Sequence, residues 1–392
     1  MSSIVIQGDT SGSITVEAPS VAGTHTLTLP KATGNIATDA TVGLGTKNLI
    51  INGDMRIAQR GTSATGLGNN DTGYHTVDRW QIWENGSPTY EFTQTQDTDV
   101  PTGQGFANSL KMACTTADAT LSADDAFAFR YKIEGQMLQH LKYGTSNAEQ
   151  ITMSFWVKSN KTGTYIVNPW ASSEISKAYT IDSADTWEKK TITFDANTID
   201  TISNNNSTGL TIYMYMLVGT DRTSGTLNTT WSALTTANRA VGQVNLADST
   251  SNYINITGVQ LEIGENATPF ENRMYSQELA MCQRYYQEIT KTAGYDNVTN
   301  ASVWQTTNAF GVFTWLPMRA SPTLTATFTD FVVRSGGTSY NATGGSFANI
   351  RPDRCQFNLG TSGLTVGRGA WYTFNTDAVT SPPQKIAISA EL

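Results

Sequence analysis

The first 46 residues contain no Phe, Tyr or Trp, and the first such aromatic residue of the chain is Tyr74. Their apolar residues are small and stand in short alternating runs, such as Ile4-Val5-Ile6, between turn residues. A segment this poor in bulky side chains cannot bury enough surface to offset its ordering entropy. We therefore expect residues 1–46 to be a β arm whose strands pair with copies of themselves or with another protein. The alternative is a tail without fixed structure.

Residues 47–273 change to longer strand patterns that include aromatic residues. Strand candidates lie at 151–158, 187–194, 210–218 and 253–263, between turns rich in Asn, Gly and Ser. Many short strands with few helical stretches predict a β-sandwich of the jelly-roll type. Trp156 and Trp187 lie in apolar strands and are assigned to the packing between the sheets. Tyr213 and Tyr215 alternate with Ile212, Met214 and Met216, so one of the two sets faces outward, and the pattern does not say which.

Residues 274–292 hold the one convincing helix pattern, from about Gln277 to Thr290. Ser276 can serve as its N-cap and Glu278 lies in its first turn. Apolar and aromatic side chains repeat with 4-3-4-3 spacing on one face: Tyr275, Leu279, Cys282, Tyr286 and Ile289. That face would suit a three-stranded junction in a homotrimer. Two heptads do not establish a coiled coil, however, and a helix packed on its own sandwich fits the pattern equally well.

Residues 293–392 return to strand patterns at 309–315, 324–333, 355–359, 370–374 and 385–391, separated by Gly-Gly and Pro-Pro turns. The expected fold class is therefore all-β. It comprises an N-terminal β arm, a central jelly-roll β-sandwich, one short connecting α-helix and a small C-terminal β-domain.

Composition excludes several function classes. The net charge is -8 and only 15% of residues are charged, without a basic stripe, so we expect no nucleic-acid partner. No long apolar run and no basic leader occur, which predicts no membrane insertion and no signal peptide. Cys114, Cys282 and Cys355 lie far apart and form neither a metal spacing nor a disulfide framework.

Five blocks of sequence carry a family resemblance: residues 22–36, 48–62, 76–80, 259–271 and 276–287. Together they resemble phage tail-fibre and related receptor-binding virion proteins that carry a carbohydrate-binding-module-like jelly-roll domain. Residues 22–36 look like their amino-terminal repeats, and 48–62 followed by 76–80 are similar to the opening of their sandwich. Residues 259–271 resemble the close of such a jelly roll, and 276–287 resemble the helix that follows it; these two blocks are the most specific part. The resemblance implies a homotrimeric virion protein involved in host attachment.

Catalytic and metal motifs are sparse. His25, His75 and His140 lie in unrelated contexts, and no nucleophile elbow, zinc pair or phosphate loop is present. We therefore expect no enzymatic activity, although scattered acids could in principle supply a glycosidase pair. We expect no cofactor. Calcium is the alternative, held by Asn52-Gly53-Asp54 near the sandwich opening with Glu262 or Glu271 near its close, where the first three residues also fit a simple turn.

Saccharides present flat C–H faces and many hydroxyl groups, which aromatic planes and neutral amides recognise well. Aromatic residues in polar or loop-like settings are the candidates for ligand binding, with core or subunit-interface burial as the alternative: Trp170, Trp231, Trp304, Trp371 and Tyr372.

Together these features predict a tail fibre on the virion, made in the host cytoplasm. Residues 1–46 would attach to another virion protein, and the molecule would recognise a host-surface polysaccharide or lipopolysaccharide as a homotrimer. The alternatives are a head-fibre, capsid-decoration or baseplate protein without a receptor role, and a glycan depolymerase.

Overall fold

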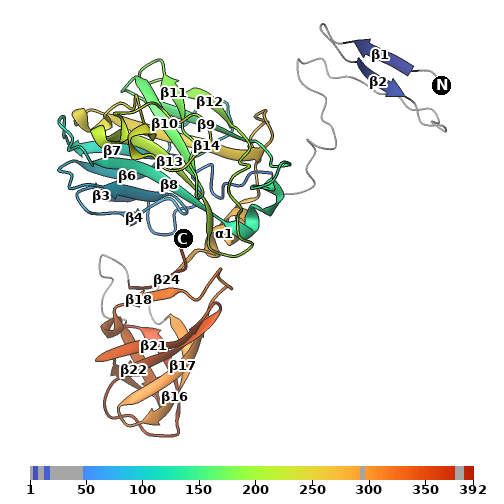
Figure 1. Cartoon of the computed structure of the whole chain (residues 1–392). Helices are drawn as coiled ribbons and strands as arrows, with labels where there is room; N and C mark the ends of the chain where they lie inside the picture. Colours follow the sequence, from blue (N-terminus) through green and yellow to red (C-terminus); the bar gives the residue numbers. More distant parts are fainter. Residues whose placement is uncertain (1–2, 8–12, 18–46, 292–295, 376–383) are drawn as a thin grey trace. The chain divides into compact units, whose positions relative to one another are not determined.

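A computed structural model describes residues 3–7, 13–17, 47–291, 296–375 and 384–392. The chain divides into two compact units, residues 1–45 and residues 46–392 (Figure 1). Antiparallel sheets make up most of the described structure, with a single α-helix among the described residues. The predicted all-β fold class, with a jelly-roll sandwich and one helix, is confirmed.

The first unit contains a β-hairpin. Strand β1 (Ser3–Gln7) pairs antiparallel with β2 (Ser13–Glu17), and Val5 lies opposite Thr15. The remainder of the predicted arm lies outside the described residues, so its partner stays a prediction.

Two six-stranded antiparallel sheets form the central sandwich (Figure 1). The first sheet, called sheet D below, has the order β11-β10-β13-β8-β5-β4. Its strands are β4 (Gly73–Tyr74), β5 (Gln81–Asn85), β8 (Ala126–Glu134), β10 (Gly163–Trp170), β11 (Lys177–Ile181) and β13 (Thr208–Val218). The second, sheet B, has the order β12-β9-β14-β7-β6-β3. Its strands are β3 (Ser63–Leu67), β6 (Glu91–Asp97), β7 (Ser109–Thr116), β9 (Ile151–Ser159), β12 (Glu188–Phe194) and β14 (Tyr253–Ile263).

Side-chain alternation along these strands builds the core between the sheets. The inward set on β13 is Ile212, Met214 and Met216, which join the main hydrophobic cluster of the sandwich. Tyr213 and Tyr215 therefore face outward, but they are buried in a second apolar cluster on the other side of sheet D. Short 3-10 helices lie in the connections: η1 (Gly135–Met137), η2 (Gln139–Leu141), η3 (Thr220–Arg222), η4 (Thr236–Asn238) and η5 (Leu246–Asp248).

Helix α1 is shorter than the sequence pattern predicts. It spans Tyr275–Gln283, and Met274 rather than Ser276 is its N-cap. Residues Tyr286–Thr290 form strand β15, which pairs antiparallel with β24 (Lys385–Ser389). The predicted helical second half is therefore wrong, because pairing with a strand about a hundred residues away overrides the helical spacing.

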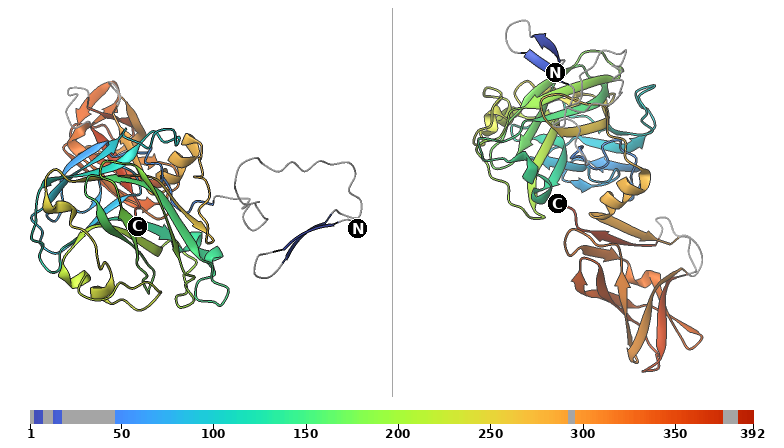
Figure 2. Two further views of the ribbon diagram at one scale, coloured as in Figure 1. Left: turned by 90° about the horizontal axis from the view of Figure 1, so that it is seen from above. Right: turned by 90° about the vertical axis from the view of Figure 1, so that its right-hand side faces the viewer.

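The predicted junction face is consequently divided. Tyr275 is 57% exposed and Leu279 is half-buried, whereas Cys282 is fully buried with Ile51 and Ile57 of the sandwich. Tyr286 and Ile289 lie on β15 and share no helical face with the others. Helix α1 packs on its own sandwich, beside which Figure 2 shows it, and its role in a trimer junction stays a prediction.

Residues 286–392 contain two further sheets and a hydrophobic core of their own. One sheet has the order β15-β24-β18, with β18 at Thr323–Ala326. The other, sheet F, has the order β20-β19-β23-β16-β17-β22-β21. Its strands are β16 (Asn297–Gln305), β17 (Asn308–Thr314), β19 (Phe331–Ser335), β20 (Thr338–Asn341), β21 (Gly344–Arg351), β22 (Arg354–Gly360) and β23 (Gly369–Phe374); η6 (Phe328–Asp330) precedes β19. In the part of the chain that the structure describes, no helix has the length and apolar character to cross a membrane.

Candidate functional site

Three of the five predicted ligand-binding aromatics are not displayed in the way their sequence context suggests. Tyr372 is fully buried in the C-terminal core. Trp231 is 8% exposed, its ring packs edge-on against Tyr143, and its indole N–H donates to the Asp195 carbonyl at 2.6 Å. Trp170 is the last residue of β10 rather than a loop residue, and it packs half-buried against the apolar cluster outside sheet D. Tyr372 and Trp231 are therefore buried in the hydrophobic cores, which agrees with the alternative of core burial.

Trp304 and Trp371 are exposed, at 51% and 38%. They lie on β16 and β23, which are neighbours in sheet F. Trp304 makes an edge contact with Phe310 of β17, with ring centroids 6.5 Å apart. These two residues remain candidates for contact with a ligand or with another subunit.

A groove on sheet B combines an aromatic ring with neutral polar groups, and we call it the Trp156 groove. It has a volume of about 430 Å³. Its floor comes from strands β9, β12 and β14, and its walls come from the connection between β6 and β7 and from the segment after β14. The lining residues are Gln104, Phe106, Ser154, Trp156, Lys189, Gly258, Ala267, Thr268, Pro269, Phe270 and Asn272.

Strand alternation explains why Trp156 reaches this groove. Its neighbours Phe155 and Val157 are fully buried in the core, so Trp156 points to the opposite, outer face of sheet B. Trp156 is half-buried, and its indole N–H makes no hydrogen bond with any described residue, which leaves that N–H and part of the ring accessible. The assignment of Trp156 to sandwich packing is therefore wrong. Lys189 of β12 and Thr257 of β14 lie directly opposite it on either side.

One wall of the groove depends on a glycine. Gly258 has φ +61° and lies where the pairing of β14 with β9 shifts register between Thr257 and Gln260. A Cβ at Gly258 would be 2.5 Å from Cζ of Phe106, so only a glycine lets this ring lie on the strand. Phe106 in turn meets Phe270 edge-on, with centroids 5.2 Å apart.

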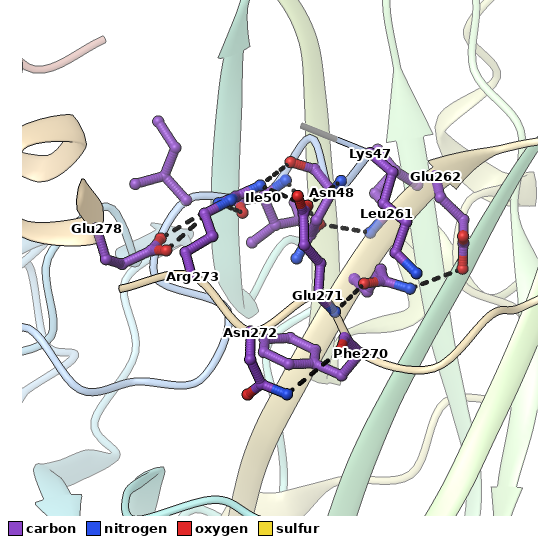
Figure 3. A network of polar contacts seen from close by, with 12 residues as sticks. Lys47, Asn48, Ile50, Leu261, Glu262, Phe270, Glu271, Asn272, Arg273 and Glu278 are labelled. Atoms are coloured by element: carbon purple, nitrogen blue, oxygen red, sulfur yellow. Dashed lines mark hydrogen bonds and ion pairs between the residues drawn. The ribbon is translucent and has the colours of Figure 1, made fainter. Parts of the chain in front are cut away.

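Buried polar contacts hold the other wall, residues 264–273, against the start of the sandwich (Figure 3). Glu262 accepts hydrogen bonds from the Thr268 backbone N–H and from Nε2 of Gln260, both at 2.8 Å. Arg273 donates to the Ile50 carbonyl at 3.1 Å and pairs with Glu271 at 3.1 Å. This network fixes the wall because each buried charge has a partner.

The same contacts bear on the calcium hypothesis. The carboxylate of Glu262 accepts hydrogen bonds from the N–H and O–H groups of Thr268. The carboxylate of Glu271 accepts one from the Asn48 N–H and pairs with Arg273, and Asp54 pairs with Arg56. Among the described residues, no group of three or more His, Cys, Asp or Glu side chains could hold a metal ion. Each of these carboxylates therefore already has a structural partner nearby in the chain or in the sandwich, and the expectation of no cofactor, with calcium as the alternative, stays a prediction.

Next to the groove, the outer face of sheet B carries an ordered carboxylate. Burial acts to raise the pKa of Asp99, but hydrogen bonds from Lys158 and from Nε1 of Trp187 outweigh it, so the pKa is lowered. Trp187 therefore lies on this outer face, half-buried, and not between the sheets as predicted. The face thus presents aromatic rings beside hydrogen-bonding groups, an arrangement that can stack on a sugar ring and bind its hydroxyls.

No protein-family model and no curated protein matches this chain. Among solved structures it is similar to the enzymatically active domain of tailspike protein 4 of bacteriophage CBA120, at 13% identity and TM-score 0.28, over 51% of this chain and 21% of that one. It is also similar to TmCBM61 in complex with β-1,4-galactotriose, at 9% identity and TM-score 0.27, over 56% of this chain and 100% of that one. A third is the CBM22-1–CBM22-2 tandem domain of Paenibacillus barcinonensis Xyn10C, at 9% identity and TM-score 0.24, over 86% and 96%. The chain spans about a fifth of the tailspike domain, and similarities this low carry no argument about function.

Proposed function

We propose that this chain is a phage appendage protein of the tail-fibre type whose Trp156 groove binds a saccharide on the host surface, without cleaving it. The observation that carries the proposal is the outward placement of Trp156 in a groove about 430 Å³ in volume. A volume of this size suits a short stretch of sugar units, and the polar side chains of Gln104, Ser154 and Asn272 offer partners for hydroxyl groups.

Binding rather than cleavage is favoured by the chemistry of the lining. Glycoside hydrolases ordinarily use a pair of Asp or Glu side chains on either side of the scissile bond. None of the described residues that line the Trp156 groove is Asp or Glu. A saccharide held there would therefore find no carboxyl group among the described lining residues to protonate its glycosidic oxygen.

The appendage part of the proposal rests on the arm and on the family resemblance. An isolated two-stranded hairpin such as β1–β2 is marginally stable at best in water. This hairpin would therefore be stabilised if residues 1–46 paired with another virion protein or with copies of themselves. A homotrimer would present three grooves and raise avidity without a tight single site.

Binding of purified protein to a glycan array, followed by titration calorimetry on the best-bound glycan, tests the proposal. We expect Trp156→Ala to reduce affinity at least tenfold, because a stacked aromatic ring is lost from the site. The matched controls are Trp304→Ala and Trp371→Ala, which remove exposed tryptophans on sheet F. Loss of binding in the controls with normal binding in Trp156→Ala would move the site to sheet F.

The same titrated glycan, incubated with the protein and sized by chromatography, should keep its chain length. Shortened chains would support a depolymerase instead. Deleting residues 1–46 should leave glycan binding of the purified protein intact while removing the protein from assembled particles.

A further inference from the structure

The Trp156 groove contains one ionisable side chain among its described lining residues, the ammonium group of Lys189. This is notable on a chain whose net charge is -8. Lys189 is exposed, and it lies directly opposite Trp156 in the antiparallel pairing of β12 with β9. Directly opposed residues point to the same face with Cβ atoms about 5 Å apart, so the side chains of Lys189 and Trp156 leave the same face of sheet B as neighbours.

The acids near Lys189 are already paired with other cations. Its neighbour Glu188 binds Lys190 at 2.5 Å, and Asp182 lies 3.2 Å from the same ammonium group. On the next strand, Lys158 is paired with Asp99. The ammonium group of Lys189 forms no ion pair or hydrogen bond with any described residue, which leaves a positive charge available in the groove.

We infer that the Trp156 groove selects an anionic saccharide, one whose sugar ring stacks on Trp156 while a carboxylate or phosphate on that unit or the next reaches Lys189. The inference rests on the proposed saccharide-binding function and names its ligand class. A neutral sugar can use the ring and the amides but leaves the ammonium group without a partner. An acidic sugar adds a charge-assisted hydrogen bond in a partly enclosed site.

Glycan-array binding with acidic and neutral members tests this inference in two steps. The strongest binders should carry carboxylate or phosphate groups. Comparing the carboxylated with the phosphorylated glycans on the array shows which anion is preferred. For the best-bound carboxylated glycan, the carboxyl-reduced form is the neutral comparison. We expect wild-type protein to bind the acidic form about threefold to tenfold more tightly, as for a partly exposed ion pair.

Three variants of the intact chain separate the effect of the Lys189 charge from saccharide binding by the rest of the groove. Lys189→Gln should lose the preference and bind both forms alike, whereas Lys189→Arg should keep it. Lys142→Gln is the matched control, because Lys142 is an exposed lysine outside the groove lining, paired with Glu149. Raising the salt concentration should weaken wild-type binding to the acidic glycan and leave Lys189→Gln nearly unchanged.

The outcomes distinguish the two proposals. If Trp156→Ala abolishes binding while Lys189→Gln binds the acidic glycan as wild type does, the groove binds saccharides but the inferred charge selection is wrong. Strongest binding to neutral glycans also overturns it. If no glycan on the array binds, the proposed function and the inference fail together.

Discussion

Replacing Gly258 with alanine tests whether the groove wall is built as described. The new Cβ would lie 2.5 Å from Cζ of Phe106, and 3.0 Å and 3.1 Å from its two Cε atoms. Phe106 must therefore move away from β14, which breaks its edge contact with Phe270. The backbone at φ +61° adds the strain of a left-handed alanine.

The structure supplies a matched control for that strain. Gly66 in β3 of the same sheet has φ +71°, and a Cβ there would meet no atom within 4 Å. Gly66→Ala should therefore cost backbone strain alone, about 1 kcal/mol. Gly258→Ala should cost about 2 kcal/mol, because the Phe106–Phe270 contact contributes about 1 kcal/mol more.

Urea unfolding followed by Trp fluorescence measures the two costs, and glycan titration measures the effect on the groove. We expect Gly258→Ala to weaken binding and Gly66→Ala to leave it unchanged. In a Phe106→Ala background, Gly258→Ala should cost no more than Gly66→Ala does. If Gly258→Ala and Gly66→Ala lowered the unfolding free energy of the otherwise wild-type protein equally, the packing of Phe106 against Gly258 would be refuted.

Three further predictions concern stability and reactivity. Burial raises the pKa of Asp78 from 3.8 to about 6, so the protonated carboxyl favours the folded state. This contribution to stability is lost as the pH rises from about 4 through 6. In urea titrations, the unfolding free energy of the wild type relative to Asp78→Asn should fall by about 3 kcal/mol between pH 4 and pH 7. Glu391→Ala removes the carboxylate that lies 2.5 Å from the buried Arg79, and it should lower the unfolding free energy by about 3 kcal/mol. The control Glu149→Ala breaks an exposed ion pair and should cost about 0.5 kcal/mol or less. Equal losses in the two variants would contradict a stabilising buried pair. Burial raises the pKa of the Cys282 thiol, and all three cysteines are buried, so Ellman's reagent should label them in denaturant but not in the native protein at pH 8.

Strand positions were the most predictable part of the fold. Alternating or continuous apolar runs located β9, β13, β14 and most strands after residue 296, because burial on one face sets a period of two. The helix prediction is wrong after Gln283, because Tyr286 and Ile289 fit helical spacing, whereas in a strand their separation of three residues places them on opposite faces. Pairing with β24 decides between the two, and a partner that far away in the chain leaves no local signal.

The candidate site was less predictable. Trp156 was assigned to the core from its apolar neighbours, although alternation with Phe155 and Val157 places it outside. The prediction that Tyr372 is displayed for a ligand is wrong for the same reason, because Tyr372 follows the exposed Trp371 on β23 and therefore faces inward. The groove walls could not be predicted, because they depend on where two long connections lie over sheet B.

Fluorine NMR of protein labelled with 5-fluorotryptophan tests the central claim most directly. The chain has nine tryptophans, and Trp156→Phe assigns the resonance of interest. On titration with the best-bound glycan, we expect the Trp156 signal to shift while that of the buried Trp231 stays in place. A titration that shifts Trp304 or Trp371 and leaves Trp156 unchanged would contradict saccharide binding in the groove.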